Sequence, residues 1–341
     1  MSYEVNEKSI EMIKDFSEAK GPSGFEDEVL TVARKYISDI ADVREDCLRN
    51  LYMYRRKNTG SKPVFMLDAH SDEVGFMVHS IKPCGTLRFV PLGGWNVGAL
   101  PSSKVWVRNA DGAYLPGIIA AKPVHFMTAA EKAHGSQEIS DLVIDIGATS
   151  ADEAVEKFHI RIGEPIVSAV DFEYDRERDV MIGKGFDCRI GCAALMETMR
   201  RLENEDLAVD VVGVLSSQEE VGERGVKVAV NTVKPQIALC YEGCPADDTF
   251  TDPYAIQTAL KKGPMLRFMD KSIICSPRYQ RFALDLAAQR GLAVQRELRP
   301  RRRRQQWRHH QHRPGRHSKH RGRRPRALHP LPLRDHLLQR L

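Results

Sequence analysis

An acidic pair, Glu219 and Glu220, closes the apolar run 211–215. The run is typical of a buried parallel strand, and the pair falls just beyond its carboxyl end, where open α/β sheets place their active sites. In a metallohydrolase, one carboxylate of such a pair coordinates a metal and its neighbour acts as general base on an activated water. The alternative is an acidic pair in an exposed loop.

A second strand-like run, 63–67, ends in a similar way. It leads into His70 and Asp72, whose side chains share one face if the segment is extended. A metal-bound histidine usually donates its other ring N–H to a carboxylate, so Asp72 could orient a ligand His70. The alternative is a solvated polar strand end.

Two more carboxylates stand at comparable positions. Asp187 precedes a predicted helix and Glu242 follows a predicted strand. Asp187 could bridge two cations or simply cap the helix, a role that Asp fills readily. Glu242 could be a metal ligand or a loop acid. Each signal is weak alone, but together they predict a hydrolytic metal site at one edge of a sheet.

Helices and strands alternate in the segments that would position these residues. In chain order we predict a helix around 10–16, a helix over 29–37, two strands within 51–67, a helix over 193–202, a strand over 211–215, a helix around 226–230, a strand over 237–240 and, last, a helix over 278–290. Gly21-Pro22-Ser23-Gly24 breaks the first helix. Short β-like runs between Gly-rich turns indicate a small β-rich module inserted at 77–175.

Charge and cysteine usage point to a cytoplasmic protein. The net charge of the chain is +5, but residues 296–341 alone carry about +14, so the rest sums to −9, an ordinary acidic surface. The seven Cys include no Cys-x-x-Cys pair, so we expect neither a zinc finger nor a disulfide framework, and we expect Cys188, Cys192, Cys240 and Cys244 to be divided between core and loop positions. We find no secretory signal and no apolar run long enough to span a bilayer, and we expect no membrane partner.

Four motifs resemble those of the tetrahedral (TET-like) dinuclear-metal aminopeptidases, a family that includes glutamyl aminopeptidase and relatives labelled endoglucanase. They are His70-Ser71-Asp72-Glu73-Val74-Gly75, Phe186-Asp187-Cys188-Arg189, Gln218-Glu219-Glu220-Val221-Gly222 and the segment from Gly263 to Asp270. The resemblance runs to about Gln295. It implies a zinc-peptidase fold, a three-layer α/β/α domain with an inserted small β-barrel-like domain, and assembly into a homo-oligomer, with the dodecamer as family precedent.

The resemblance also implies residue roles. His70 and Glu242 would bind the first of two divalent metal ions, Glu220 the second, and Asp187 both. Glu242 stands where the family usually has Asp, so its longer side chain changes the reach of this ligand. The metals, zinc or else cobalt or manganese, would activate a water with Glu219 as general base, and Asp72 would assist. The implied function is an aminopeptidase that removes N-terminal residues from peptides; a related metal-dependent deacylase or carboxypeptidase is the alternative enzyme.

The implied domains are a catalytic metallopeptidase domain, 1–76 plus 176–295, a β-rich oligomerisation domain, 77–175, and an aberrant Arg- and His-rich tail, 296–341.

In the family, a Gly-rich stretch and the segment Arg-Tyr-Ile-His-Ser-His, which supplies a metal ligand, would stand where this tail is. One interpretation is that the basic tail binds nucleic acid, and another is that the chain is a catalytically impaired homologue. However, read one base later, suitable codons for Arg301–Arg303 encode Gly-Gly-Gly, and those for 327–333 encode Arg-Tyr-Ile-His-Ser-His-Tyr. We therefore interpret the tail as frameshifted and do not expect nucleic acid as a partner.

Overall fold

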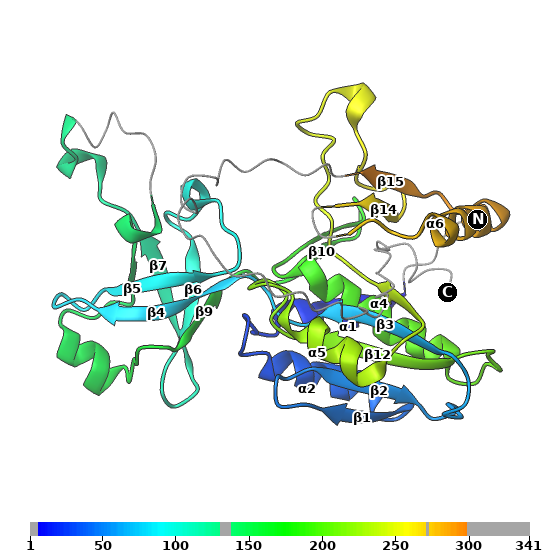
Figure 1. The fold of residues 1–341 in the computed structure, drawn as a ribbon. Coiled ribbons are helices and arrows are strands. Elements are labelled where there is room, and N and C mark those ends of the chain that lie inside the picture. Colours follow the sequence, from blue (N-terminus) through cyan, green and yellow to red (C-terminus); the bar gives the residue numbers. More distant parts are fainter. Residues whose placement is uncertain (1–5, 130–137, 271–272, 299–341) are drawn as a thin grey trace, which may run out of the picture.

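The computed structural model describes residues 6–129, 138–270 and 273–298, which form an α/β domain and a β-barrel beside it (Figure 1). The central sheet of the α/β domain has the strand order β1-β2-β12-β3-β13. Its strands are β1 (Ala41–Glu45), β2 (Leu51–Arg55), β3 (Val64–His70), β12 (Asp210–Ser216) and β13 (Ile237–Cys240). β3 lies parallel to both β12 and β13, and Ser216 at the end of β12 is paired with His70 at the end of β3. The two apolar runs are therefore the adjacent parallel strands that the sequence predicts.

The two strands predicted within 51–67 are present as β2 and β3, but they are not paired with each other. β12 lies between them, antiparallel to β2 and parallel to β3. This arrangement places the loop after β12 beside the end of β3, which brings Glu219 and Glu220 to His70.

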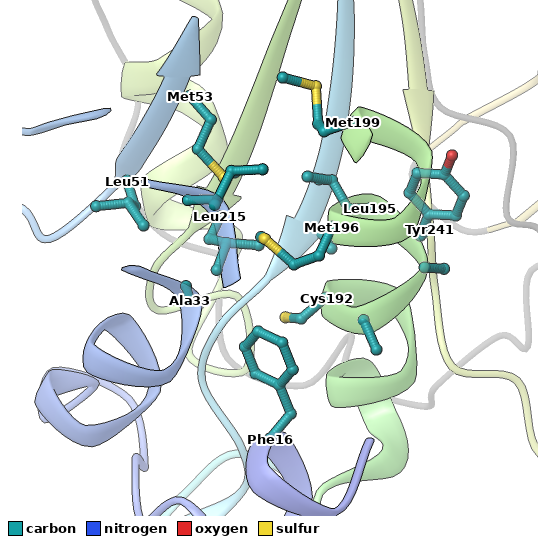
Figure 2. Close-up of a cluster of buried hydrophobic side chains, with 14 of the residues drawn as sticks. Phe16, Ala33, Leu51, Met53, Cys192, Leu195, Met196, Met199, Leu215 and Tyr241 are labelled. Atoms are coloured by element: carbon teal, nitrogen blue, oxygen red, sulfur yellow. The ribbon is translucent and has the colours of Figure 1, made fainter. Parts of the chain in front are cut away.

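Helices cover both faces of the sheet. α1 (Glu7–Glu18), α2 (Asp27–Ile37) and α4 (Phe186–Leu202) lie on one face, where Phe16, Leu195 and Leu215 belong to one buried cluster (Figure 2). α5 (Arg224–Val233) packs on the other face through a second cluster that includes Val212 and Val214. The alternation along β12 follows from the two-residue period of a strand, and each large side chain buried in this way contributes about 1.5–3 kcal/mol. The domain therefore has three layers, as expected.

The inserted module is a closed barrel with the strand order β4-β5-β8-β7-β6-β9. Its strands are β4 (Gly75–Ile81), β5 (Leu87–Leu92), β6 (Lys104–Arg108), β7 (Tyr114–Ala120), β8 (Val143–Asp145) and β9 (Pro165–Ser168). Phe76 and Trp95 stack inside it with ring centroids 4.5 Å apart. The barrel-like domain is thus confirmed, and its first strand begins only five residues after His70.

Two element boundaries differ from the prediction. α4 begins at Phe186, before the predicted start at 193, but Asp187 and Cys188 have non-helical backbone angles, so Asp187 still precedes the regular part of the helix. The helix predicted as the last element, α6 (Pro277–Gln289), is followed by β15 (Gln295–Leu298), which pairs in parallel with β14 (Met265–Met269). β15 lacks an apolar pattern because its buried residue is Glu297, which is held by Arg267 at 3.0 Å.

The remaining elements are small. A hairpin of β10 (Glu173–Asp175) and β11 (Val180–Ile182) joins the barrel to α4 along the chain. Short helical turns lie at Val97–Ala99, Val124–Phe126, Ile139–Asp141, Glu153–Lys157 and Pro253–Ala255. No helix within residues 6–129, 138–270 and 273–298 is both long enough and apolar enough to cross a lipid bilayer.

A buried ionic group ties α1 to α4 beneath the sheet edge. Arg189 is 0 % exposed, donates to the carbonyl groups of Phe16, Ala19 and Gly21, and lies 3.3 Å from Glu73. Lys184 would remain 2.7 Å from Glu73, so Arg189→Leu removes donors from buried carbonyl groups but does not leave the carboxylate unpaired, and we expect it to lower the free energy of unfolding by roughly 1–3 kcal/mol. Urea unfolding would measure this, with the surface variant Arg201→Leu on the same helix as control; equal, small losses in both variants would contradict it.

Candidate metal centre

His70 is the centre of a group of acidic side chains at the carboxyl edge of the sheet. It ends β3 and is almost completely buried. Its Nε2 lies 2.9 Å from Oδ1 of Asp187, in the first turn of α4, and 3.3 Å from Oε1 of Glu242, two residues beyond β13. Gly243 permits this approach, because a Cβ at this position would lie 2.7 Å from the Cα of Asp187.

The loop after β12 adds the acidic pair to the same place. Ligand atoms of His70, Glu219 and Glu220 lie within 4.8 Å of one another, as do those of the group around Asp187 and Glu242. The structure therefore brings together the five residues that the sequence singled out as ligands or base. It supplies them from three strand ends and one helix start, as their positions in the sequence suggested.

Asp72 connects the two groups. The Nδ1 of His70 lies 3.1 Å from the backbone oxygen of Asp72 and 3.5 Å from its carboxylate. The carboxylate accepts the backbone N–H groups of Glu219 at 2.8 Å and Glu220 at 3.2 Å. Asp72 thus lies beside His70, as expected, although its backbone oxygen and not its carboxylate is the nearer acceptor. It also fixes the backbone of the acidic pair, which no pattern in the sequence indicated.

The electrostatics of the group favour a bound cation. Burial raises the pKa values of Glu219 and Glu220 to about 7. Burial alone would lower the pKa of His70, but the neighbouring Glu242 and Asp187 carboxylates hold it well above its usual value. Within the described residues, His70 is the one ion-pair partner of Asp187 and Glu242. One imidazole and four carboxylates form a donor set that suits divalent metal ions, and so many acidic groups at one place favour a bound cation.

Cys188 is a site neighbour that the sequence did not indicate. Its thiol is fully buried and belongs to the same group as His70, Asp187 and Glu242. The Sγ donates to the backbone oxygen of Tyr241 at 3.0 Å. Burial raises the pKa of this thiol well above its usual value, which favours the neutral form.

The barrel also approaches the site. Gly93 has φ +87°, and a Cβ there would lie 3.2 Å from the Oε2 of Glu220 and 2.6 Å from the Cγ1 of Val74. The loop that follows β5 therefore forms part of the wall around Glu220. A side chain at position 93 would collide with Val74 and press on Glu220, a candidate ligand. The positive φ also favours glycine at this position.

Comparison with known families decides what kind of site this is. The family model for the M42 glutamyl aminopeptidases matches residues 50–330. The chain belongs to this family. The match extends beyond Gln295 into residues outside the described ranges. Membership in the M42 family makes the protein a hydrolase of the metal-dependent aminopeptidase class, which confirms the family and the function implied by the motifs.

Relatives and solved structures agree with this membership. The glutamyl aminopeptidase of Lactococcus lactis is 32% identical over 276 residues, which cover 81% of this chain and 77% of the relative. The TET aminopeptidase of a marine-sediment Thaumarchaeota archaeon superimposes with a TM-score of 0.81 at 37% identity, covering 86% of this chain and 82% of that one. The TET1 peptidase of Pyrococcus horikoshii, which can assemble into a tetrahedron or a large octahedral shell, gives a TM-score of 0.73 at 30% identity, with coverages of 84% and 83%.

Proposed function

We propose that this M42 aminopeptidase uses His70, Asp187, Glu220 and Glu242 to hold two divalent metal ions and Glu219 as general base, and that it removes N-terminal residues from peptides. The observation that carries the proposal is the convergence of Asp187 and Glu242 on the Nε2 of His70, with the acidic pair next to it. Asp187 would contact both ions, His70 and Glu242 the first, and Glu220 the second.

The contacts of His70 suit a metal ligand. Its Nδ1 faces the backbone oxygen of Asp72, which can only accept a hydrogen bond, so the proton belongs on Nδ1. Without a metal, the raised pKa of His70 and its 2.9 Å contact with Asp187 favour a second proton on Nε2, and a bound metal ion would replace that proton. A backbone carbonyl on the distal nitrogen is a common way to fix the tautomer of a ligand histidine.

The acidic pair would divide the chemical work. When bound, the metal ions would anchor the free amine of the peptide and polarise its scissile carbonyl. Glu219 would accept the proton of the attacking water and return it to the leaving amine. Asp72 keeps the two neighbours in fixed positions because it binds both of their backbone N–H groups.

The metal and the assembly are inferred from chemistry and from relatives. The histidine and carboxylate donors suit zinc, with cobalt or manganese as substitutes. The shell-forming TET1 peptidase supports a homo-oligomer for this chain too. Peptides are the proposed partners, together with further copies of the chain in a cytoplasmic setting, and nucleic acid is not among them.

The bridging role of Asp187 predicts a specific pattern of metal loss. We expect Asp187→Asn to weaken zinc binding by about 100-fold or more, because a neutral amide replaces the shared carboxylate. Competition with a chromophoric chelator would measure the affinity. The matched control is Asp248→Asn, an exposed aspartate outside the group. Zinc affinity that is the same in both variants would exclude Asp187 as a ligand.

A further inference from the structure

Glu26 is a completely buried carboxylate whose position has no local explanation. It is 0 % exposed and immediately precedes α2, yet its side chain makes no capping hydrogen bond to that helix. Instead its Oε1 accepts the N–H of Gly24 at 2.8 Å and the N–H of Gln218 at 3.2 Å, 192 residues further along the chain. Burying a carboxylate is costly, and burial raises the pKa of Glu26 to about 7.

The residue that Glu26 contacts is the start of the acidic loop. Gln218 has φ +53°, in the left-handed region that non-glycine residues seldom adopt. Such a conformation is strained and persists only where the surroundings hold it in place. The next two N–H groups, those of Glu219 and Glu220, are bound by Asp72. Two buried carboxylates therefore hold three successive amides of this loop.

The turn at 21–26, whose sequence predicted only a helix break, supplies Glu26 and also supports Asp72. Ser23 donates its hydroxyl to the Oδ2 of Asp72 at 2.5 Å, so the turn steadies Asp72 as well as Gln218. Pro22 also forms a bridge with Glu73. The turn is thus packed between the segment after β3 and the segment after β12, beneath the residues of the metal centre.

We infer that Glu26 is a positioning residue, which acts through the backbone of Gln218 to set the orientation of Glu219 and Glu220. The catalytic consequence of this inference rests on the proposed function. The contact between Glu26 and Gln218 does not depend on the proposed function. What the loop needs from Glu26 is an oxygen acceptor at the right distance. A side chain that keeps the negative charge but is too short should lose the contact with Gln218. A neutral side chain of the same length should keep it.

Two substitutions separate reach from charge. Glu26→Asp keeps the charge but withdraws the acceptor by one methylene, and Asp is a good helix N-cap, so α2 should not suffer. Glu26→Gln keeps an oxygen at the same reach without the charge. Glu28→Gln is the matched control, because Glu28 lies on the same helix and binds the N–H of Lys20, away from the metal centre.

Hydrogen exchange of the soluble fraction of the full 341-residue chain, without metal or substrate, tests the contact. We expect the peptide that contains 218–220 to exchange about tenfold faster in Glu26→Asp, and within about twofold of the parent in Glu26→Gln and Glu28→Gln. Peptides from β3 and α4 should not change. Unchanged exchange of the loop in Glu26→Asp, or equal acceleration in the Gln variant, would overturn the inference.

Turnover of an aminoacyl p-nitroanilide by the same substitutions, made in the protein with its reading frame restored after Gln295, tests the consequence. In Glu26→Asp we expect kcat to fall about 10- to 100-fold with KM nearly constant, because the reacting groups are displaced but the substrate still binds. Glu26→Gln should restore kcat. A looser loop with unchanged kcat would overturn the positioning role. Absent turnover in the parent would count against the proposed function, and the exchange result would still decide whether Glu26 holds the loop.

Discussion

Glu219→Gln, in the protein with its reading frame restored, is expected to lower kcat by roughly 10²–10⁴-fold, the usual contribution of a general base. The substitution removes the proton acceptor but keeps the shape of the side chain. The backbone N–H that Glu219 gives to Asp72 is also unaffected, so the loop should keep its position. Metal content and oligomeric state should equal those of the parent, as measured by elemental analysis and light scattering.

Two neighbouring glutamates provide the controls. Glu220→Gln should lose metal together with turnover, because Glu220 is the proposed ligand. Glu223→Gln, in the same loop, should change neither. Near-normal hydrolysis of aminoacyl substrates by Glu219→Gln would remove this residue from the mechanism.

We propose that the reading frame of the chain is shifted after Gln295. The expected loss of activity is as large as that caused by Glu219→Gln. The described residues offer the second metal only Asp187 and Glu220, whereas zinc usually takes about four donors. Apolar side chains near the end of the described chain are also open to solvent, among them Phe282 of α6, which is 64 % exposed, and Leu298 of β15. We therefore expect the 341-residue chain to aggregate, to be close to inactive and to hold at most one tight metal ion.

Restoring the shifted frame should return the second metal and the peptidase activity together. Elemental analysis and turnover on the two purified chains measure both quantities. Two tightly bound ions and full aminopeptidase turnover in the 341-residue chain would contradict the frameshift interpretation. Resequencing the DNA around the codon for Gln295 checks it independently.

The parallel strands and the site residues at their ends were predictable because they depend on local patterns. The apolar runs that became β3 and β12 are buried on both faces, so their composition alone identifies them. Polar residues that follow such strands must collect at one sheet edge, which is why His70, Glu219 and Glu242 could be grouped without a structure.

Contacts between distant segments were not predictable. Nothing near β2 and β3 shows that β12 lies between them, because the partner of a strand is chosen by the whole fold. β15 was missed because its buried residue is the ion-paired Glu297, and polar segments carry no strand signal. Glu26 was missed because a glutamate at a helix start looks like any exposed acid, and its contact with Gln218 depends on tertiary packing alone.

The most direct test of the dinuclear centre is an anomalous difference map from crystals of the frame-restored protein grown with zinc. We predict two peaks about 3.5–4 Å apart. The carboxylate of Asp187 should lie between them, at roughly 2.0–2.2 Å from each peak, with His70 and Glu242 at one and Glu220 at the other. A single peak, or two peaks that Asp187 does not bridge, would contradict the account.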